Sequence, residues 1–86
     1  MNRIALFEKA KLRMVAIKEK FPRIDTITSV INQLDYLIGL ESGTETNRDR
    51  LKDIIIGIQA AREIELLDEE AANLLYDVAL EVDRMK

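Results

Sequence analysis

Apolar side chains are densest between Leu51 and Leu67, where they fall on two neighbouring sides of a helical wheel. A helix that is apolar on two sides needs at least two neighbours to cover it, so this stretch predicts the most enclosed helix. Gly57 costs about 1 kcal/mol of helix propensity, but with Ala60 and Ala61 it lets another backbone come close. The two stripes are Leu51, Ile54, Ile55, Ile58 and Ala61, and Ile56, Ala60, Ile64 and Leu67.

Two helices are predicted before this stretch. The first runs from about Asn2, as N-cap, to Lys20, and it ends there because Pro22 holds the residue before it in an extended conformation. The second begins at Asp25, which we expect to cap it, and stops at Gly43 as the C′ residue. The segment between the second helix and the central one holds a glycine and small polar residues, which are typical of a loop.

The central helix and a fourth helix each have a start signal. Thr46 and Asp49 have the spacing of a capping box, and Asp68 can cap the last helix. Short connections leave consecutive helices as neighbours, so the sequence predicts an all-α fold, an antiparallel bundle of about four helices. A continuous third and fourth helix would instead require a dimer. The apolar stripe of the last helix is Ala71, Leu74, Leu75, Val78, Val82 and Met85.

Composition excludes most enzyme chemistry. The 86 residues suffice for one domain, 1–86, and the chain contains no cysteine and no histidine. Disulfides, thiolate nucleophiles, imidazole bases and the usual zinc ligands are therefore absent, and we expect neither an enzyme nor a bound cofactor. No signal peptide is predicted, and no apolar run approaches the roughly 20 residues that span a bilayer. We expect the protein to be cytoplasmic and not to bind membranes.

The net charge of −3 is unevenly distributed. Residues 1–23 carry seven basic and two acidic side chains, whereas residues 63–83 carry eight acidic and no basic ones. One interpretation is that the first and last helices lie side by side and attract each other. The other is an acidic docking face for a protein. Nucleic acid is not expected as a partner, because the acidic part would repel phosphates and the basic part lacks interleaved tyrosines and glycines.

Paired carboxylates are the only catalytic material in quantity. Five of them lie near one predicted helix junction, where a pair could transfer protons or hold a divalent ion. Di-iron bundles require histidine, and a calcium loop requires alternating acids around a glycine, so neither site is predicted. A solvated acidic helix end is the simpler interpretation. The five are Glu63, Glu65, Asp68, Glu69 and Glu70.

Two short motifs give the chain a family resemblance. The segment Gln33-Leu34-Asp35-Tyr36-Leu37 is followed by Gly57-Ile58-Gln59-Ala60-Ala61-Arg62-Glu63 and then by the acidic turn Asp68-Glu69-Glu70. Over residues 30 to 75 this order resembles the small helical immunity proteins of type VI secretion, which partner NAD(P)-glycohydrolase toxins. The turn lacks the proline that the family's acidic turn carries.

The resemblance implies a cytoplasmic, non-enzymatic protein that binds a toxin's catalytic domain and blocks its active site. A cleft that attracts a dinucleotide pyrophosphate tends to be electropositive, so an acidic partner is steered toward it. We expect Tyr36, as a half-exposed aromatic anchor, to bind this partner together with acidic charge contacts. The alternative is that Tyr36 lies at the boundary of the core and has no role in binding. The expected charge contacts are Glu63, Glu65, Asp68, Glu69, Glu70 and Asp77.

The alternative function is a helical interaction module with an unknown partner. It would form a homodimer through the last helix or through the small residues around Gly57. The motif residues leave this choice open, because each could serve packing as well as binding. They are Gln33, Tyr36, Gly57, Arg62 and Glu63.

Overall fold

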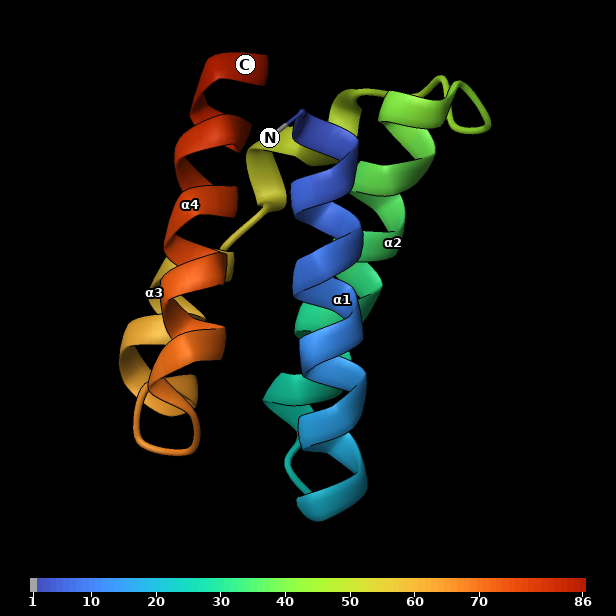
Figure 1. Cartoon of the computed structure of the whole chain (residues 1–86). Helices are drawn as coiled ribbons and strands as arrows, with labels where there is room; N and C mark the ends of the chain where they lie inside the picture. Colours follow the sequence, from blue (N-terminus) through green and yellow to red (C-terminus); the bar gives the residue numbers. More distant parts are fainter. Residues whose placement is uncertain (1) are drawn as a thin grey trace.

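A computed structural model describes residues 2–86 as a small all-α bundle. Its long helices are α1 (Arg3–Lys20), α2 (Asp25–Ser42) and α4 (Glu69–Met85). Between α2 and α4 lie the 3₁₀-helix η1 (Asp49–Asp53), the single α-helical turn α3 (Ile56–Gln59) and the π-helical turn η2 (Ala60–Ile64). The helix α1 runs antiparallel to both α2 and α4, and α3 lies behind α4 (Figure 1). The predicted antiparallel bundle is confirmed.

The ends of the long helices follow the local signals at most positions. Asn2 Oδ1 accepts a hydrogen bond from the Ala5 amide at 2.7 Å, which caps α1 as predicted. Gly43 ends α2 with φ of 86°, a left-handed conformation that favours glycine. The prediction for Asp25 was wrong, since Ile24 occupies the N-cap position of α2 without a side-chain bond. Asp25 instead lies in the first turn, where its charge suits the helix dipole.

The segment from Leu51 to Leu67 is not the single helix that its pattern predicts. The chain is extended at Ile54, between η1 and α3. Three consecutive β-branched isoleucines followed by a glycine lower helix propensity at this point. Gln33 of α2 stabilises the break, because its Oε1 accepts a hydrogen bond from the Ile55 amide at 2.9 Å. The same side chain donates to Gln59 Oε1 at 2.7 Å and so attaches α3 to α2.

The predicted capping box at Thr46 was also wrong. The amide of Asp49 donates instead to Asn47 Oδ1 at 2.8 Å, and the amide of Asn47 donates to Glu45 Oε1 at 2.9 Å. Asparagine and glutamate side chains therefore satisfy the backbone of this connection locally. The result is a tight loop that leads into η1 rather than the N-terminus of a long helix.

One cluster of buried side chains joins α1, α2 and α4 to the segment that contains η1, α3 and η2. Gly57 faces α4, and a Cβ atom added there would lie 3.2 Å from Cβ of Ala79. This confirms the predicted close packing contact. The largest fully buried side chains are Phe7, Met14, Ile27, Leu34, Leu37, Ile56, Ile64 and Leu75.

The chain reverses direction between η2 and α4. Asp68 has φ of −162°, an extended conformation that separates the two helical segments. The alternative of a continuous third and fourth helix was therefore wrong, and the bundle closes within one chain (Figure 1). No helix of residues 2–86 combines the length and the apolar character needed to cross a membrane.

Candidate partner-binding surface

The turn between η2 and α4 is held by a short set of backbone bonds. The amides of Leu67 and Asp68 both donate to the Ile64 carbonyl, at 2.9 and 2.8 Å. The side chain of Ile64 is fully buried and anchors the turn in the core. Leu66, two residues later, points the other way and is 89% exposed, more than any other large apolar side chain described.

Asp68 fixes the position of this turn against α4 and α1. Its Oδ1 accepts from the Ala71 amide at 2.9 Å, so the predicted N-cap is confirmed. Its Oδ2 accepts from Arg13 of α1, at 2.9 Å from Nε and 2.7 Å from Nη2. Burial alone would raise the pKa of the Asp68 carboxyl, but the bonds from Ala71 and Arg13 outweigh it and the pKa is lowered. Only 16% of the Asp68 side chain is exposed, so its main role is to hold the turn against α4 and α1.

The remaining acids of the turn divide into paired and unpaired groups. Glu70 lies 3.1 Å from Arg13 Nη2 and shares that cation with Asp68. Glu65 accepts a hydrogen bond from the Tyr76 hydroxyl at 2.6 Å, and this bond raises the pKa of the tyrosine. Glu63 and Glu69 are exposed and form no ion pair with any residue of 2–86.

We define the acidic end as Glu63, Glu65, Leu66 and Glu69. Beside it lies an open hollow of about 470 Å³, lined by Ile24, Thr26 and Arg62 as well as by Glu63 and Leu66. Leu66 was not among the predicted contacts. On the wheel of the predicted helix it lies beside the first apolar stripe, eleven residues after Ile55, so the pattern does not distinguish it from a core leucine.

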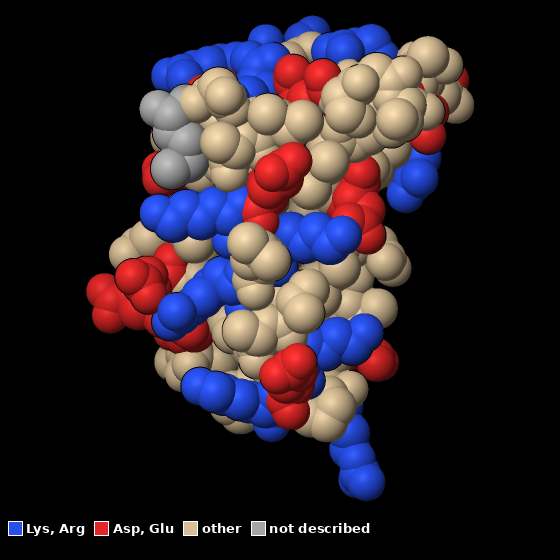
Figure 2. All heavy atoms as spheres, turned by 45° about the vertical axis from the view of Figure 1, so that its right-hand side comes forward, with Lys and Arg blue, Asp and Glu red and all other residues tan. Residues whose placement is uncertain are grey.

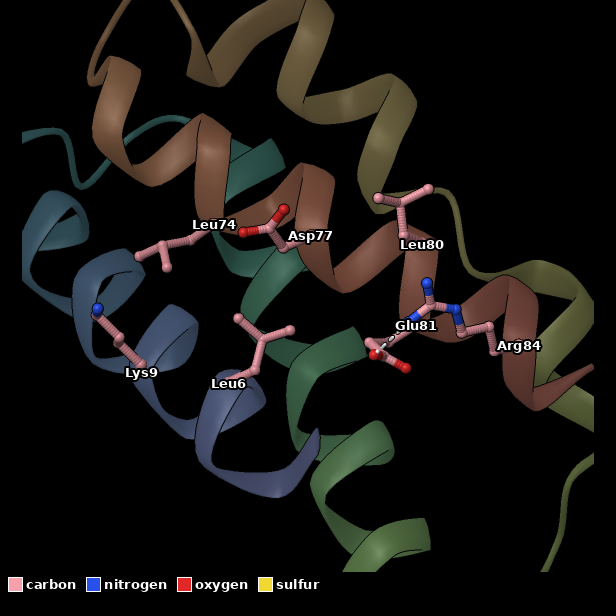
Figure 3. Close-up of a pocket in the computed structure, with 7 residues that line it drawn as sticks. All are labelled: Leu6, Lys9, Leu74, Asp77, Leu80, Glu81 and Arg84. Carbon is pink, nitrogen blue, oxygen red and sulfur yellow. Dashed lines mark hydrogen bonds and ion pairs between the residues drawn. The ribbon is translucent and has the colours of Figure 1, made fainter. Parts of the chain in front are cut away.

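The structure places Asp77 away from the acidic end. It lies two turns further along α4 and lines a groove between α1 and α4, together with Leu6 and Lys9 of α1 (Figure 3). Neither Asp77 nor Lys9 forms an ion pair within the described chain. The six predicted charge contacts therefore do not form one surface.

The prediction that Tyr36 is half-exposed was wrong. Its side chain is 5% exposed, its hydroxyl donates to the Asn47 carbonyl, and the Arg50 guanidinium lies 4.7 Å from the ring centroid. The connection from α2 to η1 folds over the ring and covers it. Tyr36 therefore holds this connection in place and offers no surface to a partner in this conformation.

The other motif residues also have structural roles. Gln33 and Gln59 form a polar network with Ser29 that joins α2 to α3, and Gly57 allows α4 to come close. The exceptions are Arg62 and Glu63, which are exposed at the hollow beside the acidic end.

The uneven charge of the sequence is partly neutralised within the fold. Arg3 binds Glu81 at 3.3 Å and Glu41 at 2.8 Å, and the bond to Glu41 raises the pKa of the arginine. With the Arg13 pairs, these contacts confirm that the first and last helices lie side by side and attract each other. The face seen in Figure 2 accordingly shows basic and acidic side chains interleaved. No three carboxylates of residues 2–86 converge as a metal site would require.

Comparison with known proteins gives a family and no closer relative. No curated protein and no solved structure matches the chain. The Tsi6 family model matches residues 3–84, from the first residue of α1 to the last turn of α4. Since this match covers nearly the whole chain, the protein belongs to the Tsi6 family, a family of immunity proteins of type VI secretion.

Proposed function

We propose that this chain neutralises a toxin of the NAD(P)-glycohydrolase class by placing its acidic end over the toxin's active-site cleft. Membership of an immunity family supports a toxin as the partner. The protein acts by stoichiometric binding in the cytoplasm, without catalysis and without a cofactor. The observation that carries the assignment of this surface is Leu66, fully presented to solvent on a firmly held turn with Glu63 and Glu69 unpaired on either side of it in the sequence.

Charge supports the choice of partner surface. A cleft that binds the pyrophosphate of NAD⁺ or NADP⁺ needs a positive potential, and carboxylates that are free of internal partners complement it. Arg13 already compensates Asp68 and Glu70, and the Tyr76 hydroxyl donates to Glu65, so the carboxylates at this end without an internal partner are Glu63 and Glu69. Glu65 remains a proposed contact through its charge.

Leu66 supplies the apolar contact that charges alone lack. Binding energy in protein interfaces concentrates in a few side chains that become fully desolvated at the centre, surrounded by polar groups that exclude water. A leucine that protrudes from a rigid turn loses little conformational freedom on binding, since its backbone is already ordered by Ile64 and Asp68. It is placed to enter the mouth of a cleft.

The experiment measures association of the purified chain with its toxin's catalytic domain over a range of ionic strength. We expect Glu63→Lys with Glu69→Lys to slow association at low salt by about tenfold or more and to flatten its salt dependence. We expect Leu66→Ala chiefly to speed dissociation, because it removes a contact made only in the complex.

Asp83→Lys is the matched control. It makes the same change of charge as either single reversal, on an exposed residue in the last turn of α4, at the other end of that helix. If the control slows association as much as Glu63→Lys or Glu69→Lys alone, net charge and not this surface guides the encounter. Unchanged kinetics for all variants would contradict the proposal.

A further inference from the structure

A groove runs between α1 and α4 on the outside of the bundle. It consists of two adjoining hollows, of about 420 and 370 Å³, that share Lys9 and Leu74. Its wall on α4 extends from Glu70 to Arg84, which is about 21 Å of helix at about 1.5 Å per residue. The groove is therefore as long as a helix-to-helix contact.

Leucines line this groove on both walls. Leu6 of α1 and Leu74 of α4 extend into the space between the helices, while Leu80 stands on the outer side of α4 (Figure 3). Leu80 is 59% exposed, and Leu12 on the opposite wall is 73% exposed. Single exposed leucines are ordinary, but several that share one concave surface indicate an interaction site.

The charges of the groove balance. Its lining carries three basic and three acidic side chains, in contrast to the acidic end. Four of them are compensated within the chain, through the pairs that Arg13 makes with Glu70 and Arg84 with Glu81. Lys9 on α1 and Asp77 on α4 form no ion pair within the described chain, although they line the same hollow. A neutral surface does not steer a strongly basic toxin, whereas one free charge of each sign makes it complementary to itself.

From this arrangement we propose that the groove face binds a second copy of this chain in a symmetric homodimer. With the two-fold axis parallel to the groove, α1 of each copy lies opposite α4 of the other. Lys9 then meets the partner copy's residue 77 twice, once on each side of the axis, and the exposed leucines enter the hollows of the facing copy. The acidic end remains free, so this inference does not depend on the proposed function.

The area required is within reach of one face of the molecule. A standard interface buries about 800 Å² per partner, about 15% of the total surface of 5348 Å². The bundle measures 32 × 24 × 20 Å, and the groove follows much of its length. Since most of the pairing charges are already satisfied, burial of leucines provides the main attraction and Lys9 with Asp77 fixes the register.

The test is sedimentation equilibrium of the full chain alone, over a wide range of concentration. We expect the wild-type chain to form a dimer, and Lys9→Glu and Asp77→Lys each to weaken self-association at least about tenfold, because each brings like charges together at two places. A mixture of the two variants restores association, since each reversed charge then meets an opposite one. Lys52→Glu, an exposed change of the same kind outside the groove, is the control.

Three results would overturn this proposal. They are a wild-type chain that stays monomeric at every concentration, single variants that associate like the wild type, and a mixture that fails to associate. Loss of toxin binding in the groove variants without any wild-type dimer would likewise overturn it, by assigning the groove to the toxin. Both side chains lie at the surface, so circular dichroism at a concentration low enough for every chain to be monomeric should report the same melting temperature for all variants.

Discussion

Replacement of Asp68 tests how the turn that carries the acidic end is held in place. Two contacts meet at this carboxylate, the cap on the Ala71 amide through Oδ1 and the pair with Arg13 through Oδ2. Because the two contacts use different oxygen atoms, different substitutions remove them separately. Asp68→Ala removes both, Asp68→Asn keeps a capping oxygen but loses the charge, and Arg13→Gln loses the charge from the other side.

The expected losses follow from the exposure of each group. The cap contributes about 1 kcal/mol. The ion pair contributes about 0.5 to 1 kcal/mol, because Arg13 is 42% exposed and solvent screens it. Asp68→Ala should therefore lower the free energy of unfolding by about 2 kcal/mol, which in a domain of this size lowers the melting temperature by about 10 °C. Asp68→Asn and Arg13→Gln should each cost about 1 kcal/mol or less, and together less than the sum.

The pH dependence has a definite sign. The pKa of Asp68 is lower in the folded protein than in the unfolded chain, where a value of about 3.9 is ordinary. Its ionised form therefore contributes stability that is complete above that value and is lost as the pH falls through the folded-state pKa. The difference in stability between the wild type and Asp68→Asn should shrink below about pH 4.

Urea unfolding followed by circular dichroism measures these differences. The account of the turn fails if Asp68→Asn is as unstable as Asp68→Ala, since the cap would then contribute nothing. It also fails if Asp68→Ala costs less than about 0.5 kcal/mol, the lower limit for loss of a capping side chain.

Three further predictions concern other contacts. Gly57→Leu should destabilise the fold by about 1 to 3 kcal/mol, because its Cβ already meets Ala79 at 3.2 Å; thermal unfolding showing no loss would contradict the close packing. Tyr36→Phe should cost about 0.5 to 1.5 kcal/mol by removing a hydrogen bond to the connection after α2, and equal stability in urea would argue against that bond. In an absorbance titration, Tyr76 should ionise above its ordinary pKa because its hydroxyl donates a hydrogen bond to the Glu65 carboxylate, and Glu65→Gln should lower that pKa.

The long helices could be predicted because their signals are local. Asn2 and Asp68 cap, and Gly43 stops a helix, through contacts within a few residues. The third segment could not, because its break depends on Gln33, a side chain more than twenty residues earlier that takes the Ile55 amide. A helical wheel assumes that each backbone amide bonds to a carbonyl of its own helix. Here the Ile55 amide donates instead to a side chain of another helix.

The candidate site, too, combines features that the sequence shows with features that depend on packing between helices. The cluster of acids at the turn was visible in the sequence, but the ion pairs of Asp68 and Glu70 with Arg13 depend on how α1 packs against α4. Tyr36 is covered by a connection whose path has no periodic signal. Leu66 was overlooked because the pattern assigned its neighbours to a longer helix, and the turn that exposes it arises only once that helix ends.

The most direct measurement is co-expression of this chain with the catalytic domain of its toxin, followed by assay of cellular NAD⁺ and of co-purification. The account predicts that NAD⁺ falls when the toxin domain is expressed alone and is preserved by a stoichiometric complex with the wild-type chain. It further predicts that the Glu63→Lys, Leu66→Ala and Glu69→Lys triple variant loses both the complex and the protection, while Asp83→Lys keeps both. A toxin domain that leaves NAD⁺ intact would contradict the glycohydrolase assignment, and full protection by the triple variant would contradict the role of the acidic end.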